Sequence, residues 1–111
     1  MKAKPVVPRG RAERDVGEAV EHYAREGGGE VALEFIQSLQ KAYTHIGRHP
    51  GSGSLRYAHE LGLPELRCWA LARFPHLIFY VERSDHVDIW RVLHARRDVP
   101  ASMQDPSAEG S

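Results

Sequence analysis

The sequence has little of what marks several large classes of protein. Its 111 residues include one cysteine, Cys68, so a small secreted domain stapled by disulfides is excluded and a reducing cytoplasm is expected. No run approaches the roughly 18 apolar residues of a membrane span, and no apolar stretch follows the basic amino terminus as it would in a signal peptide. Internal repeats and a glycine-rich phosphate-binding motif are also missing. We therefore expect one small, cytoplasmic domain with no membrane contact.

An excess of charge of one sign is missing too. Fifteen Lys and Arg residues balance fifteen Asp and Glu residues, so the formal net charge at pH 7 is zero. Affinity for nucleic acid comes largely from neutralised phosphates. A protein held to nucleic acid by its overall charge is therefore not expected, although this leaves a local basic patch open.

The first half of the chain has helical periodicity. Residues 9–26 carry apolar side chains at the i, i+4, i+7, i+8, i+11 spacing of one helix face, and glycines 27–29 then end the helix. A second stripe predicts a helix over residues 30–47. The short link between them makes an antiparallel helical hairpin. The stripes consist of Ala12, Val16, Ala19, Val20 and Tyr23, and of Ala32, Phe35, Ile36, Leu39, Ala42, Tyr43 and Ile46.

The second half changes to the period of strands. Prolines, glycines and serines mark residues 50–64 as a loop that is long enough to be a place to look for function. Residues 65–74 and 87–94 alternate, and residues 77–82 are almost wholly apolar, as in a central strand covered on both faces. Short connections predict antiparallel pairing, and the prolines around residues 6–7 predict an edge strand there. In the last strand, alternation places Val87, Ile89, Arg91 and Leu93 opposite Asp88, Trp90, Val92 and His94.

These patterns predict an α+β fold in which an N-terminal helical hairpin packs on a small antiparallel β-sheet. We expect residues 1–98 to form a single domain and residues 99–111 to form a flexible C-terminal tail. A fold class does not identify a function.

Motifs for metal binding and nucleophilic catalysis are weak. Among seven histidines, His45 and His49 stand at i, i+4, but a zinc site needs three or four ligands and no cysteine pair accompanies them. The alternative is favourable charge at a helix C-terminus. Cys68 lies among apolar neighbours and is interpreted as a small core residue. Ser52 and Ser54 lack the strand-to-helix elbow of a hydrolase nucleophile. We predict no metal and no cofactor.

Arginine and histidine gather in the sheet half. Arginine can hold a phosphate with two parallel hydrogen bonds, and histidine can act as an acid or base. Such a sheet could grip RNA and assist phosphoryl transfer; the alternative is that the arginines pair with nearby carboxylates or face water. The residues are Arg67, Arg73, Arg83, Arg91, Arg96 and Arg97, with His76, His86 and His94.

The strand aromatics leave a similar choice. Trp69 and Trp90 are assigned by alternation to faces that also carry polar residues, so one of them could lie at a partner surface, where tryptophan is enriched. The alternative is a core under the helices, shared with Phe74, Phe79 and Tyr80.

Five fragments, in order, resemble the RelE/ParE superfamily of type II toxins, and its ParE branch most of all. The similarity runs from about residue 6 to residue 100. The fragments are residues 12–16 (AERDV) with Tyr23, then Ala32 with Phe35, residues 49–53 (HPGSG), residues 64–69 (PELRCW) with 74–80 (FPHLIFY), and residues 88–98 (DIWRVLHARRD).

This resemblance implies a bacterial toxin, of the kind linked to plasmid stabilisation, that a ParD-like antitoxin encoded beside it neutralises. ParE-type toxins are described as poisons of DNA gyrase, whereas RelE-type relatives cut messenger RNA in the ribosome. Zero net charge and the lack of an evident C-terminal catalytic tyrosine favour gyrase and a function without catalysis. A third alternative is a degenerate toxin that keeps only antitoxin binding. Operator DNA is expected to be bound only through the antitoxin.

The resemblance also suggests site residues. Arg67 matches a strand arginine of the RNA-cutting relatives, so in a nuclease Arg67 would stabilise phosphate charge and His94 would move a proton. In a binding toxin no residue is catalytic, and Arg67 could instead be structural. An antitoxin segment would lie on the helical hairpin and the sheet edge, as a helix or an added strand. The candidates for target binding are Arg67, Arg91, His94, Arg96 and Arg97.

Overall fold

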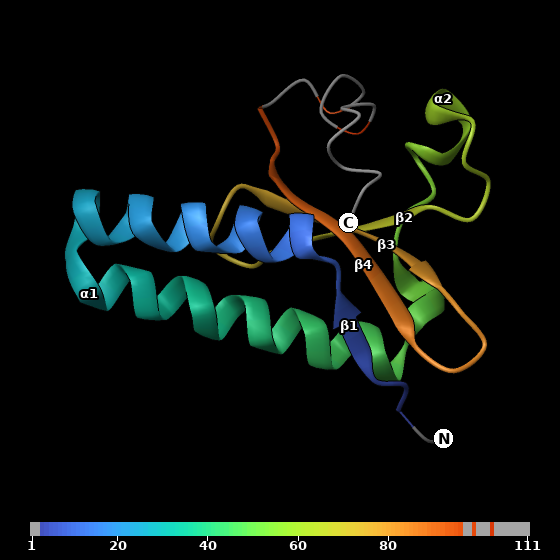
Figure 1. Ribbon diagram of the computed structural model, residues 1–111, viewed down its shortest axis with the longest axis horizontal. Helices are drawn as coiled ribbons and strands as arrows, with labels where there is room; N and C mark the ends of the chain where they lie inside the picture. The colour runs from blue at the N-terminus through green and yellow to red at the C-terminus, as the bar shows by residue number, and fades with distance from the viewer. Residues whose placement is uncertain (1–2, 97–98, 100–102, 104–111) are drawn as a thin grey trace.

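The computed structural model of the protein describes residues 3–96, 99 and 103. The strands form one sheet in the order β1-β4-β3-β2, with the helices beside it (Figure 1). The elements are β1 (Val6–Pro8), α1 (Gly10–Arg48), the 3₁₀ turn η1 (Pro50–Ser52), α2 (Ala58–Leu61), β2 (Arg67–Ala70), β3 (His76–Glu82) and β4 (Val87–His94).

Helix α1 consists of two antiparallel arms that meet at Gly28. The backbone of Gly28 has φ 84° and ψ 177°, a conformation that is essentially restricted to glycine. We call residues 10–27 the first arm and residues 29–48 the second arm; Figure 1 shows the chain reversing between them. The predicted helical hairpin is confirmed, and it reverses within the glycine triplet as expected.

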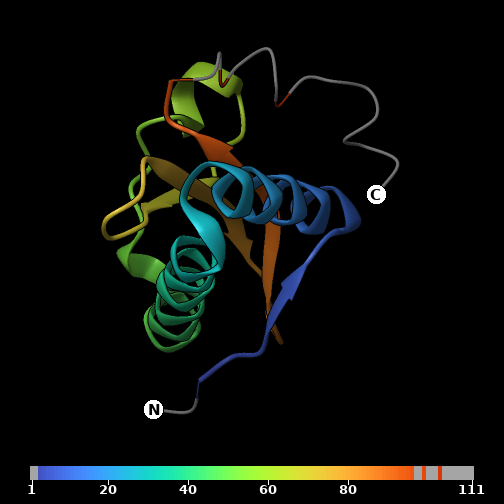
Figure 2. The same cartoon turned by 90° about the vertical axis from the view of Figure 1, so that its left-hand side faces the viewer.

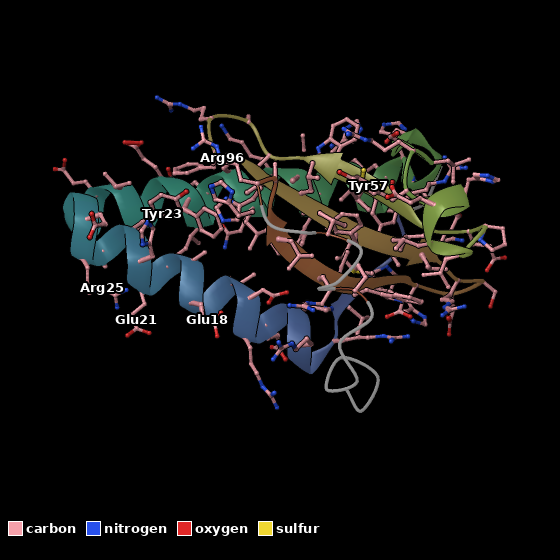
Figure 3. All side chains as sticks on the ribbon, turned by 90° about the horizontal axis from the view of Figure 1, so that it is seen from above. Glu18, Glu21, Tyr23, Arg25, Tyr57 and Arg96 are labelled. Atoms are coloured by element: carbon pink, nitrogen blue, oxygen red, sulfur yellow. The ribbon has the colours of Figure 1, made fainter. Side chains whose placement is uncertain are left out.

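The arms pack on one face of the sheet, as the end-on view in Figure 2 shows. Their apolar side chains and those of the sheet form the first core cluster. Tyr23 lies between the arms (Figure 3), with its ring centroid 5.4 Å from that of Phe35 and 5.0 Å from that of Phe74. Glu21 and Arg25 project away from the second arm. The buried members of the cluster are Ala12, Phe35, Leu39, Ala42, Ile46, Leu71, Ile78, Tyr80, Val87, Ile89 and Val92.

The other face of the sheet carries a second core cluster. It is covered by Tyr57, Leu61 and Leu63, which lie in and around α2 within the predicted loop 50–64. The central strand β3 sends Leu77, Phe79 and Val81 to this face and Ile78 and Tyr80 to the other, which confirms that it is buried on both sides. Of the expected tail, Val99 and Met103 contact this cluster and the rest lies outside the described residues. The other members are Leu66, Cys68 and Leu93, with Tyr57, Leu61, Leu63 and Trp90 packed against them.

The sheet is mixed rather than wholly antiparallel. Strands β2, β3 and β4 pair antiparallel as predicted, but β1 lies parallel to β4. The amide of Val87 donates to the carbonyl of Pro5, and the amide of Arg9 donates to the carbonyl of Ile89, both at 2.9 Å. The proline-flanked strand therefore occupies an edge, as predicted, in the opposite sense to its neighbours.

A β-bulge at Trp90 changes which residues of β4 face the helices. Tyr80 pairs with Ile89 and Phe79 pairs with Arg91, so Trp90 is the extra residue. Beyond the bulge, Val92 joins the first cluster and Leu93 the second. The predicted strict alternation, which placed Leu93 beside Ile89, is wrong because the bulge shifts it by one residue.

Candidate functional site

Arg91 is a buried residue of the interface between helices and sheet. Its Nε and Nη2 donate to the carboxylate of Asp15 at 2.7 and 2.9 Å, and the amide of Val92 donates to the same carboxylate at 3.0 Å. The side chain of Arg91 is 2% exposed and that of Asp15 is 5% exposed. Arg91 was predicted as a target-binding residue, but its guanidinium is buried and paired with Asp15, so it is not on the surface that a target could contact.

Arg67 stands at the start of β2, where it anchors the loop after the second arm. Its Nη1 donates to the carbonyl of Gly53 at 2.9 Å. The hydroxyl of Tyr80 donates to the carbonyl of Pro50 at 2.8 Å and accepts from the amide of Gly53 at 3.0 Å. Burial raises the pKa of Tyr80, while the Gly53 hydrogen bond and the Arg67 charge oppose the rise. Arg67 thus has a structural contact while its side chain stays partly exposed.

His94 lies at the far end of the sheet from Arg67. Arg67 pairs with Tyr80 across β2 and β3, whereas His94 pairs with His76 across β4 and β3. Four residues along β3 and two strand spacings separate them, which ideal strand geometry converts to roughly 16 Å between Cα atoms. The two groups assigned to a nuclease mechanism therefore do not converge.

Other polar groups surround His94. The amide of Arg96 donates to Nδ1 of His94 at 3.1 Å, and the rings of His94 and His76 lie 5.3 Å apart. Arg96 is exposed just beyond β4 (Figure 3), and Arg97 lies outside the described residues. A hollow of about 250 Å³ beside His94 is lined by Asp15, Glu18, Ala19, His22, Tyr23, His76, Val92 and Leu93.

His45 and His49 belong to a contact network rather than to a metal centre. Nε2 of His45 lies 3.0 Å from Oγ of Ser52, and that hydroxyl donates to the carbonyl of His49 at 2.7 Å. Because its one proton is used there, Ser52 accepts from His45 and is not activated as a nucleophile. The His45 ring also stacks on Trp69, with centroids 4.3 Å apart. Within residues 3–96, 99 and 103, no group of three or more metal-ligating side chains could hold an ion.

Asp88, on β4 beside the edge strand β1, accepts hydrogen bonds from several side chains. Arg9 donates twice at 3.0 Å, Trp90 donates through its indole at 3.0 Å, and Arg83 donates at 3.2 Å. Burial would raise the pKa of Asp88, but these donors and the charge of Arg9 hold it below its usual value. The guanidinium of Arg9 also lies over the indole ring of Trp90, 4.5 Å from its centroid. Trp90 is half-buried.

The alternative that strand arginines pair with nearby carboxylates is confirmed for Arg83 and Asp88, but Asp15 was not predicted as an arginine partner. For Asp15 a signal exists, because it stands three residues after Ala12 on the buried helix face, and alternation placed Arg91 with Val87 and Ile89. A charged residue on each of two facing apolar stripes indicates a buried pair. Cys68, by contrast, is buried as predicted.

The protein has an α+β fold, with a helical hairpin packed on a mixed four-stranded sheet of order β1-β4-β3-β2. The structure is similar to a chain of the solved structure described as "Chromosomal ParDE TA system from P. aeruginosa", with a TM-score of 0.71 and 19% identity over 85% of this chain and 98% of that chain. This likeness concerns the fold. No curated protein matches the sequence at a significant level. Across the described residues, none of the helices combines the length and apolar character that crossing a membrane requires.

The sequence itself defines the family. Residues 6–99 match the family described as ParE toxin of the type II toxin-antitoxin system parDE. The chain belongs to this family and is the toxin component of a type II toxin-antitoxin system.

Proposed function

We propose that the protein inhibits DNA gyrase by binding to it, without catalysis of its own, and that a ParD-like antitoxin neutralises it. It acts in the cytoplasm, and operator DNA reaches it only through the antitoxin. A contribution to plasmid stabilisation follows where the gene pair is carried on a plasmid. Membership of the ParE toxin family supports this assignment.

The observation that carries the proposal is the separation of Arg67 from His94. A charge-stabilising arginine and a proton-moving histidine must both reach one phosphate, each within about 3 Å of its reacting atom. Arg67 and His94 stand at opposite ends of the sheet, on β2 and β4. Their placement supports a toxin that acts by contact over one that cuts RNA.

The remaining arginines agree with a protein target. Arg91 is paired with Asp15 inside the core, and the net charge of the chain is zero. A ribosome-dependent nuclease would draw affinity from many phosphate contacts. The residues that we propose for target contact are the partly exposed Arg67 and His94, the exposed Arg96, and Arg97, which lies outside the described residues.

One observation favours RNA cleavage as a second candidate. His94 is partly exposed, is adjacent to Arg96 and borders a hollow that His22 and Glu18 also line. A histidine pair with a carboxylate can provide an acid and a base.

The test is inducible expression in a bacterium without the antitoxin, with DNA and protein synthesis followed separately by pulse labelling. We expect DNA synthesis to stop first and a DNA-damage response to follow. Early arrest of translation with cut messenger would contradict the proposal and favour the nuclease. Normal growth with confirmed folded protein would leave the degenerate toxin, which only binds its antitoxin.

A second test uses purified components. The toxin should inhibit supercoiling by gyrase, and prior addition of the ParD-like antitoxin should restore it. His94→Ala separates the candidates further, because it would abolish RNA cleavage while leaving a non-catalytic inhibitor at least partly active. Unchanged supercoiling at saturating toxin would rule gyrase out as the target.

A further inference from the structure

We propose that the groove between the second arm of α1 and strand β2 is the docking site for a short, acidic, extended segment of the antitoxin. The partner's identity rests on the proposed function; the site rests on the geometry of the groove, its aromatic floor, its charges and the adjacent strand edge.

The groove follows one face of the second arm. It has a volume of about 370 Å³, and its helical side is formed by positions 34, 37, 38, 41, 42 and 45, the i, i+3, i+4 spacing of a single face. At 1.5 Å per residue this face is about 17 Å long, which matches roughly five residues of an extended chain. Its opposite side is formed by residues 69–73. The groove is therefore long enough for a short peptide segment.

An aromatic pair provides the apolar part of the groove. Trp69 is half-buried and stacks on His45 with 25° between the ring planes, and Ala42 and Leu71 line the groove beside it. The Ser52 bond fixes the orientation of the His45 ring. A rigid tryptophan in a half-open groove is typical of residues that anchor a partner. One apolar side chain of a bound segment would lie against it.

The rim of the groove is positively charged. Lys41 and Arg73 line it and are exposed. In the part of the chain that the structure describes, neither of them forms an ion pair; Glu34 is the groove's acidic residue. A bound segment would therefore fit best if it carried an apolar side chain for the floor of the groove and a carboxylate on each side of it for the two cations.

Arg73 is also held in an unusual backbone conformation. Its φ is 73°, which is uncommon for a residue other than glycine. Oγ of Ser38, on the second arm, donates to the carbonyl of the preceding Ala72 at 2.7 Å. The turn that presents Arg73 is thereby tied to the opposite wall of the groove.

The edge of β2 offers a main-chain pair to an extended segment. Cys68 and Ser54 exchange two backbone hydrogen bonds, at 2.8 and 2.9 Å, on the side away from β3. Because outward-facing backbone groups recur at every second residue, those of Ala70 point the same way and border the groove. Strand addition at such an edge is a common mode of peptide recognition, and here it selects an extended segment over a helix.

The test is binding of the full-length ParD-like antitoxin to the intact toxin. The protein has two tryptophans, so Trp90→Phe leaves Trp69 as the sole reporter, and its emission should change on binding. In this background, Lys41→Glu with Arg73→Glu should weaken affinity by about tenfold or more and reduce its salt dependence. Both sites are exposed, so folding should be retained, as circular dichroism can verify.

The control is Arg25→Glu, which reverses the charge of another exposed arginine, on the first arm and outside the groove. It should leave affinity unchanged, and Lys41→Arg should retain it. If the antitoxin binds the double variant as tightly as the parent and Trp69 emission does not move, the groove is not its site, although the proposed function stands. If the antitoxin does not bind the parent toxin, both proposals fail.

Discussion

Arg91 of β4 and Asp15 of the first arm form an ion pair that joins the helical layer to the sheet. The carboxylate of Asp15 accepts three hydrogen bonds, two from the Arg91 guanidinium and one from the amide of Val92. Both side chains are almost excluded from water. One carboxylate therefore fixes where the hairpin crosses β4, at the two residues that follow the bulge at Trp90.

Removing one member of this pair should destabilise the protein strongly. Asp15→Ala leaves a buried guanidinium without its counterion, which costs about 3–5 kcal/mol in comparable pairs. Urea unfolding at pH 7, followed by circular dichroism, measures the loss in free energy of unfolding. The exposed pair Glu21–Arg25 is the control, since Glu21→Ala should cost less than about 0.5 kcal/mol. Equal effects of the two substitutions would contradict a structural role for Asp15.

Any side chain at Gly28, where α1 reverses, should strain the backbone and destabilise the protein. Gly28→Ala forces a Cβ into φ 84°, ψ 177°, at a cost of about 1–3 kcal/mol. Neighbouring Gly29 is the matched control, because it is helical and a Cβ there would meet nothing within 4 Å. Gly29→Ala should be neutral or stabilise by up to about 1 kcal/mol. Thermal unfolding of both variants checks the contrast, and similar midpoints would refute it.

Local signals explain why most of the fold was predictable. The glycine triplet determines where the hairpin reverses, and the change of period from 3.6 to 2 separates helices from strands. The apolar run in β3 correctly indicated burial on both faces. These features depend only on residues close together in the sequence, so they can be predicted from one sequence alone.

Features that depend on distant partners were not predictable. The bulge at Trp90 arises from pairing with β3, and the parallel sense of β1 depends on how α1 returns the chain. Arg91 was a candidate for target binding because arginine binds anions well, but its guanidinium is hydrogen-bonded to Asp15, which lies 76 residues away in the sequence. The groove combines the second arm with β2, and neither stretch identifies it alone.

Asp88 should make stability depend on pH in acid. Its pKa in the folded protein lies below the usual aspartate value of 3.8, so its stabilising contribution is present above about pH 4 and is lost as the pH falls through the folded-state pKa. Asp88→Asn should therefore lower the free energy of unfolding by about 1–3 kcal/mol at pH 7, and this difference should shrink towards pH 2. Urea unfolding at a series of pH values measures it. A difference that stays constant down to pH 2 would show that ionisation of Asp88 is not the cause.

The last prediction separates a structural Arg67 from a target-binding one. Tyr80 and Arg67 both hold Gly53, through its amide and its carbonyl respectively. Tyr80→Phe should therefore speed hydrogen exchange of the Gly53 amide by about tenfold or more, since one lost buried hydrogen bond costs about 1–3 kcal/mol. Tyr57→Phe is the control, because the Tyr57 hydroxyl bonds to no described residue.

Comparing Arg67→Met with Tyr80→Phe then assigns the role of Arg67. If Arg67 acts only by anchoring the loop, the two variants should raise exchange around Gly53 and reduce toxicity to a similar extent. If its guanidinium touches the target, Arg67→Met should lose toxicity well beyond Tyr80→Phe at equal loop mobility. Growth inhibition on graded induction, with toxin levels matched by immunoblot, gives the toxicity scale, and exchange measured by NMR gives the mobility scale.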